Sequence, residues 1–347
     1  MAYKSFENTY NPKYNAIGFI RLVLATFVIV QHSYALSGYT DPLSRIGLIS
    51  FGALGVNGFF ILSGFLITSS WLNSRSIINY VWRRILRIFP AFLICLLVTA
   101  LVVAPIIIIL KGLSLNQHII TQMGGYIFKN LLLIINQPDI GNLTNSLAEK
   151  SLNGSLWTLS WEFLFYILLA IGGLFGALSK RKWLLIFLTI TYIICYWIDT
   201  CKCTIFLKFY TSSNVAILPY YFLVGSIGFL YKKHIPDSKI IFAICIVLWL
   251  LDLKYNVDYP LHPFFLLYIL LWLTMHLPIK SIERFGDYSY GLYIYHFVVI
   301  QTILILFNDQ LQPLILLLIT LPVAFGLAYL SWNLIEKRCM NFKRLIK

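Results

Sequence analysis

Long apolar stretches recur along the whole sequence, and they constrain the fold more than any other feature. Several approach or exceed the roughly 20 residues that an α-helix needs to cross a bilayer. Segments this long and this apolar are typical of helices that contact lipid on at least one side. We therefore predict about ten membrane-spanning helices. The ten stretches cover about 16–36, 48–70, 88–110, 156–178, 184–200, 214–230, 239–253, 261–277, 288–307 and 313–335.

The composition supports the same class. Of the 347 residues, 59% are hydrophobic and 12% are charged, whereas soluble domains carry about 25% charged residues. We predict an all-α, polytopic membrane protein in which residues 1–347 form a single transmembrane domain without a fused extracytoplasmic domain.

The lysines and arginines predict the orientation of this domain. Most of the 27 fall in every second connection, which the positive-inside rule assigns to the cytoplasm. Both termini are then cytoplasmic. This topology and anionic lipid account for the net charge of +14, so the charge does not indicate a nucleic-acid partner.

Two ionisable residues share one face of the first apolar stretch. Arg21 and His32 are eleven positions apart, which is about three helical turns. Two aligned ionisable groups favour a protein interior or a wet cavity over lipid. An arginine that extends to the headgroups and a histidine bonded to a neighbouring helix are the structural alternatives.

A basic cluster, YVWRRILRIFP, precedes the third stretch. Arg84 and Arg87 are three positions apart and share a helix face, while Arg83 points elsewhere. Such a pair is suited to holding phosphate groups. The alternative is a charge cluster that serves membrane insertion alone.

One acidic residue, Glu162, lies well inside an apolar stretch. A carboxylate there needs a partner. The predicted topology puts Glu162 at a depth compatible with His32, so we expect it to act on His32. A structural hydrogen bond to another helix is the alternative.

The ninth stretch begins with FGDYSYGLYIYHF. Tyr290, Tyr293 and His296 follow a three-residue rhythm that places them on one helix face. Tyr290 also suits an interfacial aromatic belt, whereas Tyr293 and His296 lie deeper and are expected to line a cavity.

Two other features bear on function. The stretch between about 111 and 155 is long and contains a polar run, so we expect it on the outer face, where a large substrate would be met. No spacing of cysteine and histidine indicates a metal site, and we predict no metal.

Five motifs in this order resemble the acyltransferase-3 family of integral membrane acyltransferases. The resemblance runs from the first apolar stretch to Glu336. The motifs are Arg21-x10-His32, the SGF segment at 63–65, Arg84-x-x-Arg87 before Pro90, Trp157-Thr158-Leu159 with Glu162, and Gly286-x-x-Ser289-Tyr290-x-x-Tyr293-x-x-His296.

The resemblance implies an enzyme of the bacterial cytoplasmic membrane. Such an enzyme takes an acyl group, most often acetyl, from cytoplasmic acyl-CoA to a hydroxyl of a cell-surface glycan or its lipid-linked precursor. A transporter or flippase for a lipid-linked glycan is the alternative.

The resemblance also assigns roles to the residues above. Arg84 and Arg87, helped by Arg21, hold the phosphates of acyl-CoA. His32 acts as the general base and Glu162 orients it or stabilises its charge. Cavity or substrate contacts fall to four aromatic residues, namely Trp157, Tyr290, Tyr293 and His296.

Overall fold

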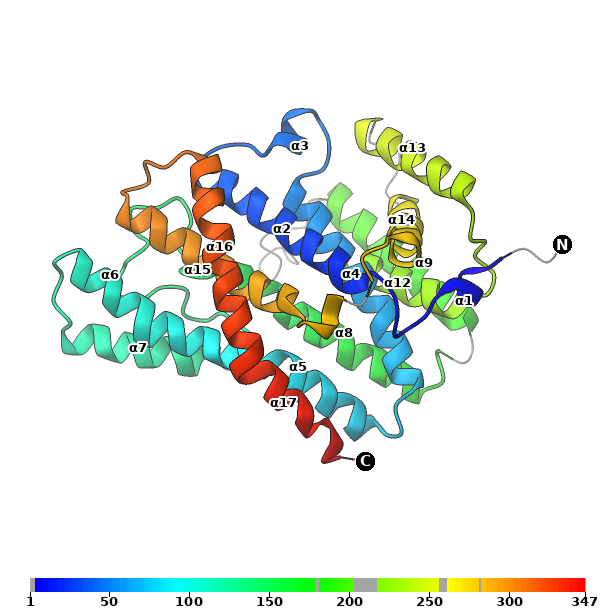
Figure 1. The fold of residues 1–347 in the computed structure, drawn as a ribbon, viewed down its shortest axis with the longest axis horizontal. Helices are drawn as coiled ribbons and strands as arrows, with labels where there is room; N and C mark the ends of the chain where they lie inside the picture. The colour runs from blue at the N-terminus through cyan, green and yellow to red at the C-terminus, as the bar shows by residue number, and fades with distance from the viewer. Residues whose placement is uncertain (1–3, 179–180, 202–216, 256–260, 281, 347) are drawn as a thin grey trace.

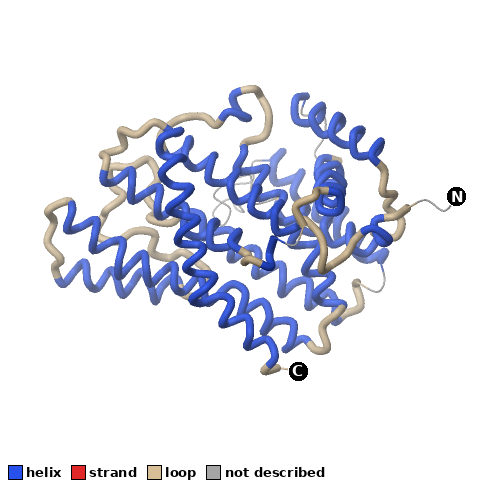
Figure 2. The backbone as a smooth tube through the Cα atoms, in the orientation of Figure 1, coloured by secondary structure: helices blue, strands red, loops and turns tan. Residues whose placement is uncertain are grey.

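The chain is helical throughout the residues that the structure describes, which are 4–178, 181–201, 217–255, 261–280 and 282–346. The structure is a computed structural model, and Figures 1 and 2 show its helices without any strand in this part of the chain. The main helices are α2 (Ile17–Leu36), α4 (Phe51–Leu72), α5 (Ile77–Val98), α6 (Ala104–Leu110), α7 (Gln117–Asn130), α8 (Trp157–Leu174), α9 (Arg181–Cys201), α12 (Leu218–Tyr231), α13 (Lys239–Tyr255), α14 (His262–His276), α15 (Tyr288–Leu306) and α16 (Pro313–Ser331).

Each of the ten predicted apolar stretches overlaps a helix in the described part of the chain, which confirms the all-α membrane class; residues 214–216 of the sixth stretch lie outside that part. Six segments of the described residues are long and apolar enough to cross a membrane. The full count of ten spans and the cytoplasmic termini stay predictions. The six segments are Ile17–Leu36, Phe51–Leu72, Ile77–Leu110, Gly154–Leu174, Tyr288–Leu306 and Pro313–Asn341.

The third span begins earlier than the sequence predicts. α5 starts at Ile77, where the side chain of Ser76 accepts a hydrogen bond from the Asn79 backbone amide, and not at residue 88. It continues through a π-helical turn, Thr99–Val103, into α6. The three arginines of the basic cluster therefore lie on the helix itself, where they face other helices.

The core lies where α2, α4, α12 and α15 meet. α4 and α12 cross closely because glycine occupies the contact on both: a Cβ on Gly64 would lie 1.9 Å from the Phe222 carbonyl oxygen, and one on Gly225 would lie 2.0 Å from that of Ile61. Small residues allow this approach where lipid supplies no hydrophobic force.

The outer helices flank this core at two ends. α6 and α7 lie at one end, and α13 and α14 lie at the other (Figure 1). The short C-terminal helix α17 (Lys337–Asn341) packs on α5 and so brings the end of the chain to the basic cluster.

Candidate functional site

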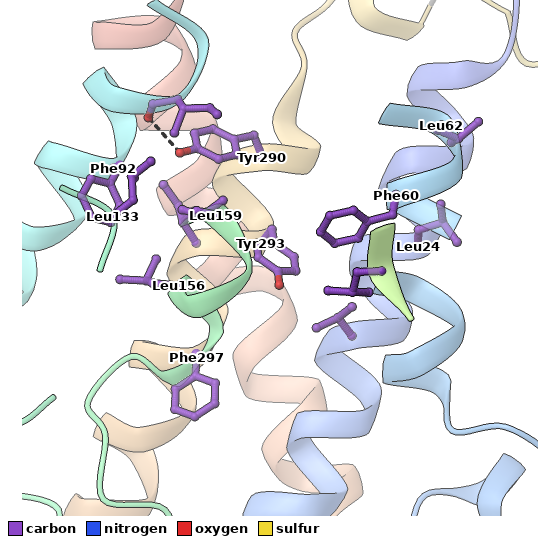
Figure 3. Packing of buried hydrophobic residues seen from close by; sticks show 14 of the residues in the cluster. Leu24, Phe60, Leu62, Phe92, Leu133, Leu156, Leu159, Tyr290, Tyr293 and Phe297 are labelled. Carbon is purple, nitrogen blue, oxygen red and sulfur yellow. Dashed lines mark hydrogen bonds between the residues drawn. The ribbon is translucent and has the colours of Figure 1, made fainter. Parts of the chain in front are cut away.

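A cavity of about 370 Å³ lies among α2, α4, α5, α8, α15 and the C-terminal segment. Figure 3 shows Tyr290 and Tyr293, two of the residues that line it, within a cluster of buried hydrophobic side chains. Its polar lining residues are Arg21, Ser63, Arg83, Arg84, Arg87, Thr158, Glu162, Tyr166, Asp287, Ser289, Tyr290, Tyr293 and Lys343.

One end of this cavity is cationic. Three of the basic residues there, Arg83, Arg84 and Lys343, form no ion pair with any carboxylate of the described residues. The Arg84 guanidinium lies 5.9 Å from the ring centroids of Tyr80 and Tyr166, and its Nη2 donates to Ser70 Oγ at 3.3 Å. The Nε atoms of Arg83 and Arg84 are buried and have no hydrogen-bond partner among the described residues. Buried donors without partners are rare in proteins and suit a bound anion.

Lys343 joins this end of the cavity from the C-terminal segment. It lies after the last spanning helix and is half-buried. Burial, together with the positive charges of Arg84, Arg87 and Arg83, lowers the pKa of Lys343 to about 8.

Arg21 and Arg87 are not free, because both pair with Asp287. The Asp287 Oδ2 atom lies 2.6 Å from Arg21 Nη1 and 2.5 Å from Arg87 Nη2, and Arg87 Nη1 lies 3.8 Å from Glu336 Oε2. Burial alone would raise the pKa of the Asp287 carboxyl, but the charges of Arg21 and Arg87 outweigh burial and hold that pKa below its usual range. The three arginines of the predicted phosphate clamp therefore differ in their partners: Arg21 and Arg87 share the Asp287 carboxylate, whereas Arg84 forms no ion pair with the described residues.

Glu162 lies at the middle of the cavity and differs from its predicted arrangement. Its Oε1 accepts hydrogen bonds from Ser63 Oγ at 3.1 Å and from the Tyr166 hydroxyl. Neither partner is His32. The carboxylate therefore adds negative charge and acceptors to the cavity wall instead of orienting that histidine.

The far end of the cavity is formed by Thr158 and Tyr293, whose hydroxyls are 2.6 Å apart. Tyr290 also lines the cavity, and its hydroxyl donates to the Ile88 carbonyl oxygen at 2.8 Å. Trp157, half-buried at the start of α8, is not among the lining residues. Of the four aromatic residues expected in the cavity, the structure therefore places Tyr290 and Tyr293 there.

His32 and His296 form a pair beyond Tyr293. His32 Nδ1 lies 2.8 Å from His296 Nε2, and the two rings are nearly parallel, with centroids 5.1 Å apart and 11° between their planes. The His296 ring lies 6.0 Å from the Tyr293 ring. The pair is outside the cavity lining, so Tyr293 separates it from the cationic end.

The long segment before α8 is fixed on α15, which sets the far end of the cavity. Gln301 Nε2 donates to the Ser151 carbonyl oxygen at 2.8 Å, and Asn153 Nδ2 donates to that of Ile294 at 2.8 Å. α8 starts four residues after Asn153, and this places Thr158 beside Tyr293.

Sequence reasoning missed Asp287 and Glu336 as partners of the arginines. Asp287 directly precedes the motif that contains Tyr290, Tyr293 and His296, and Glu336 directly follows the last apolar stretch. Both can therefore be recognised in the sequence as acidic residues near the ends of spans. Their pairing depends on α15 and the end of α16 meeting α5 in space. The described residues contain no cluster of histidine, cysteine or acidic side chains suited to a metal ion.

These features define a class: a multi-pass helical membrane protein with an internal cavity that is cationic at one end and bordered by a histidine pair at the other. The chain belongs to the acyltransferase-3 family, since residues 14–333 match the family model described as an acyltransferase domain. This confirms the resemblance drawn from the motifs.

Similar proteins carry related names. The chain is 30% identical to the O-acetyl transferase of Shigella phage Sf6, over 95% of this chain and 97% of that protein. It is 25% identical to Nodulation protein 10 of Rhizobium leguminosarum bv. viciae, over 95% and 94% of the two chains. A shorter match, 27% identical over 35% of this chain and 28% of the relative, is to Acyltransferase MdmB of Streptomyces mycarofaciens. No solved structure gives a significant match.

Proposed function

We propose that this acyltransferase moves an acetyl group from cytoplasmic acetyl-CoA to a hydroxyl of a cell-surface glycan or its lipid-linked precursor. The observation that carries the proposal is the polarity of the cavity. Cations that form no ion pair with the described residues lie at one end, and the histidine pair lies past the other. The relative named as an O-acetyl transferase supports the acetyl group and the oxygen acceptor. Because the relatives come from bacteria and a bacteriophage, we place the enzyme in the bacterial cytoplasmic membrane.

The donor end is built for a polyanion. Arg83, Arg84 and Lys343 together offer three positive charges, and the phosphates of acyl-CoA are the complementary charges. Arg21 and Arg87 have a structural role, because both pair with the single carboxylate of Asp287, which holds α2 and α5 against the start of α15.

The reacting end needs a base and a group that stabilises an oxyanion. In the proposed reaction the acceptor hydroxyl gives its proton to His32, and its oxygen attacks the thioester carbonyl carbon. The carbon–sulfur bond then breaks, and the leaving thiolate of CoA takes the proton from His32. General-base catalysis of this kind is typically worth about 10²–10⁴-fold in rate. At the far end of the cavity the Thr158 and Tyr293 hydroxyls share one hydrogen bond, and Thr158 Oγ1 also donates to the Ser155 carbonyl oxygen at 3.3 Å. The Tyr293 hydroxyl must therefore release Thr158 before it can donate to the developing oxyanion.

His32→Ala tests this function. In membranes supplied with radiolabelled acetyl-CoA, the wild type should transfer label to the glycan fraction and His32→Ala should not. His234→Ala is the matched control, because His234 lies exposed between α12 and α13 and is not among the residues that line the cavity. Full activity of His32→Ala at normal protein level would remove His32 from the mechanism. Wild-type membranes that move intact glycan without transferring label would favour the transporter.

A further inference from the structure

The hydrogen bonds of the histidine pair determine which ring nitrogen of each histidine carries a hydrogen. His296 is completely buried, and its Nδ1 lies 3.1 Å from the carbonyl oxygen of Leu292, one turn earlier on α15. A carbonyl oxygen only accepts, so Nδ1 of His296 carries a hydrogen.

The second nitrogen of His296 must then be an acceptor. No carboxylate of the described residues contacts this imidazole, and a completely buried ring without a counter-charge is neutral. A neutral imidazole has one N–H. Since Nδ1 holds it, Nε2 presents a lone pair to His32.

The same reasoning determines the tautomer of His32. Its Nδ1 lies 2.8 Å from that lone pair, so Nδ1 of His32 donates the hydrogen and Nε2 of His32 has none. The hydrogen bond to His296 and an edge contact to the Phe297 ring, 5.0 Å between centroids, hold the His32 ring in this orientation.

We propose that His296 is a positioning residue that holds His32 in the tautomer whose Nε2 takes the proton of the acceptor hydroxyl. This inference rests on the proposed function. It assigns to His296 the role that the sequence predicts for Glu162, which is to orient His32 and stabilise its charge. When the acceptor O–H bond breaks, its proton joins Nε2 of His32, and the positive ring keeps its Nδ1–H bond to the neutral His296. A hydrogen bond from a charged donor is about twice as strong as a neutral one, so the pair favours the charged state formed during transfer.

The test compares an acceptor with an apolar group at position 296. His296→Glu supplies an oxygen that only accepts, whereas His296→Leu fills space and accepts nothing. If His296 positions His32, Leu should lower kcat by about 10²-fold or more, and Glu should restore most of that loss. If His296 only fills space, the order reverses, because Leu suits a buried apolar site and Glu does not.

A second variant guards against misfolding of the Glu variant. His296→Gln also offers a carbonyl oxygen and should exceed Leu in kcat, at similar protein level and detergent melting temperature. Gln and Glu both at or below Leu would overturn the proposal. His234→Leu, exposed between α12 and α13, should match the wild type.

The experiment distinguishes an error in the role of His296 from an error in the proposed function. An active wild type, an inactive His32→Ala and a fully active His296→Leu would overturn only the role of His296. A wild type that transfers no acetyl would overturn the proposed function and this inference with it.

Discussion

At the scale of residues, the charges of the cavity fall into two groups with different partners. Arg21 and Arg87 share the carboxylate of Asp287, and a buried arginine deprived of its partner costs several kcal/mol. The Arg84 guanidinium lies near the Tyr80 ring, and the Nε atoms of Arg83 and Arg84 have no hydrogen-bond partner among the described residues. The first group holds helices together, and the second is available to a substrate.

Lys343 should make donor binding depend on pH. Its pKa is lowered to about 8, so it is charged below pH 8 and loses its charge as the pH rises past that value. Affinity for CoA should therefore fall between about pH 7 and pH 9, measured by calorimetry on the detergent-solubilised protein. The fall should vanish in Lys343→Arg, which stays charged, and in Lys343→Gln, which binds weakly throughout. A wild-type affinity that does not change over this range would contradict the assignment.

At the scale of helices, the close crossing of α4 and α12 sets the width of the core beside the cavity. α4 also carries Ser63, the partner of Glu162, one residue before the contact glycine Gly64. A change in the separation of these helices would therefore move a wall of the site.

Gly225→Ala should destabilise the protein strongly. Its Cβ would lie 2.0 Å from the Ile61 carbonyl oxygen, a backbone atom that moves only with its helix. Overpacking costs about 1–3 kcal/mol, and more where the backbone must shift. The matched control is Gly326→Ala on α16, where nothing lies within 4 Å; it should be neutral or slightly stabilising. Equal melting temperatures of the two variants in detergent would contradict the close crossing.

The sequence predicts the helices but not which side chains of different helices contact one another, for physical reasons. Apolar length alone locates spans, because lipid demands it. The predicted start of α5 is late because Arg83, Arg84 and Arg87 interrupt the apolar run, although all three lie on the helix and Arg87 pairs there with Asp287. His32 and His296 were each identified as functional, but their contact joins α2 to α15 across 264 positions. No periodicity within one helix reports such a contact.

At the scale of the whole molecule, the arrangement separates the two substrates of the proposed reaction. The cationic end lies by the C-terminal segment, which the charge distribution predicts on the cytoplasmic face. His32 lies near the other end of α2, toward the predicted outer face. Donor and acceptor would thus approach from opposite sides and meet at Tyr293 and the histidine pair.

Sidedness of donor use tests this central claim most directly. Acetyl-CoA does not cross membranes, so inverted and right-side-out vesicles that contain the acceptor glycan are each given radiolabelled acetyl-CoA from outside. Inverted vesicles, which expose the cytoplasmic face, should release CoA and place the label in glycan within the lumen, and Arg84→Gln should weaken donor binding in them. Right-side-out vesicles should leave the donor intact. Equal use of donor by both kinds of vesicle, or label that never reaches the glycan, would contradict the account.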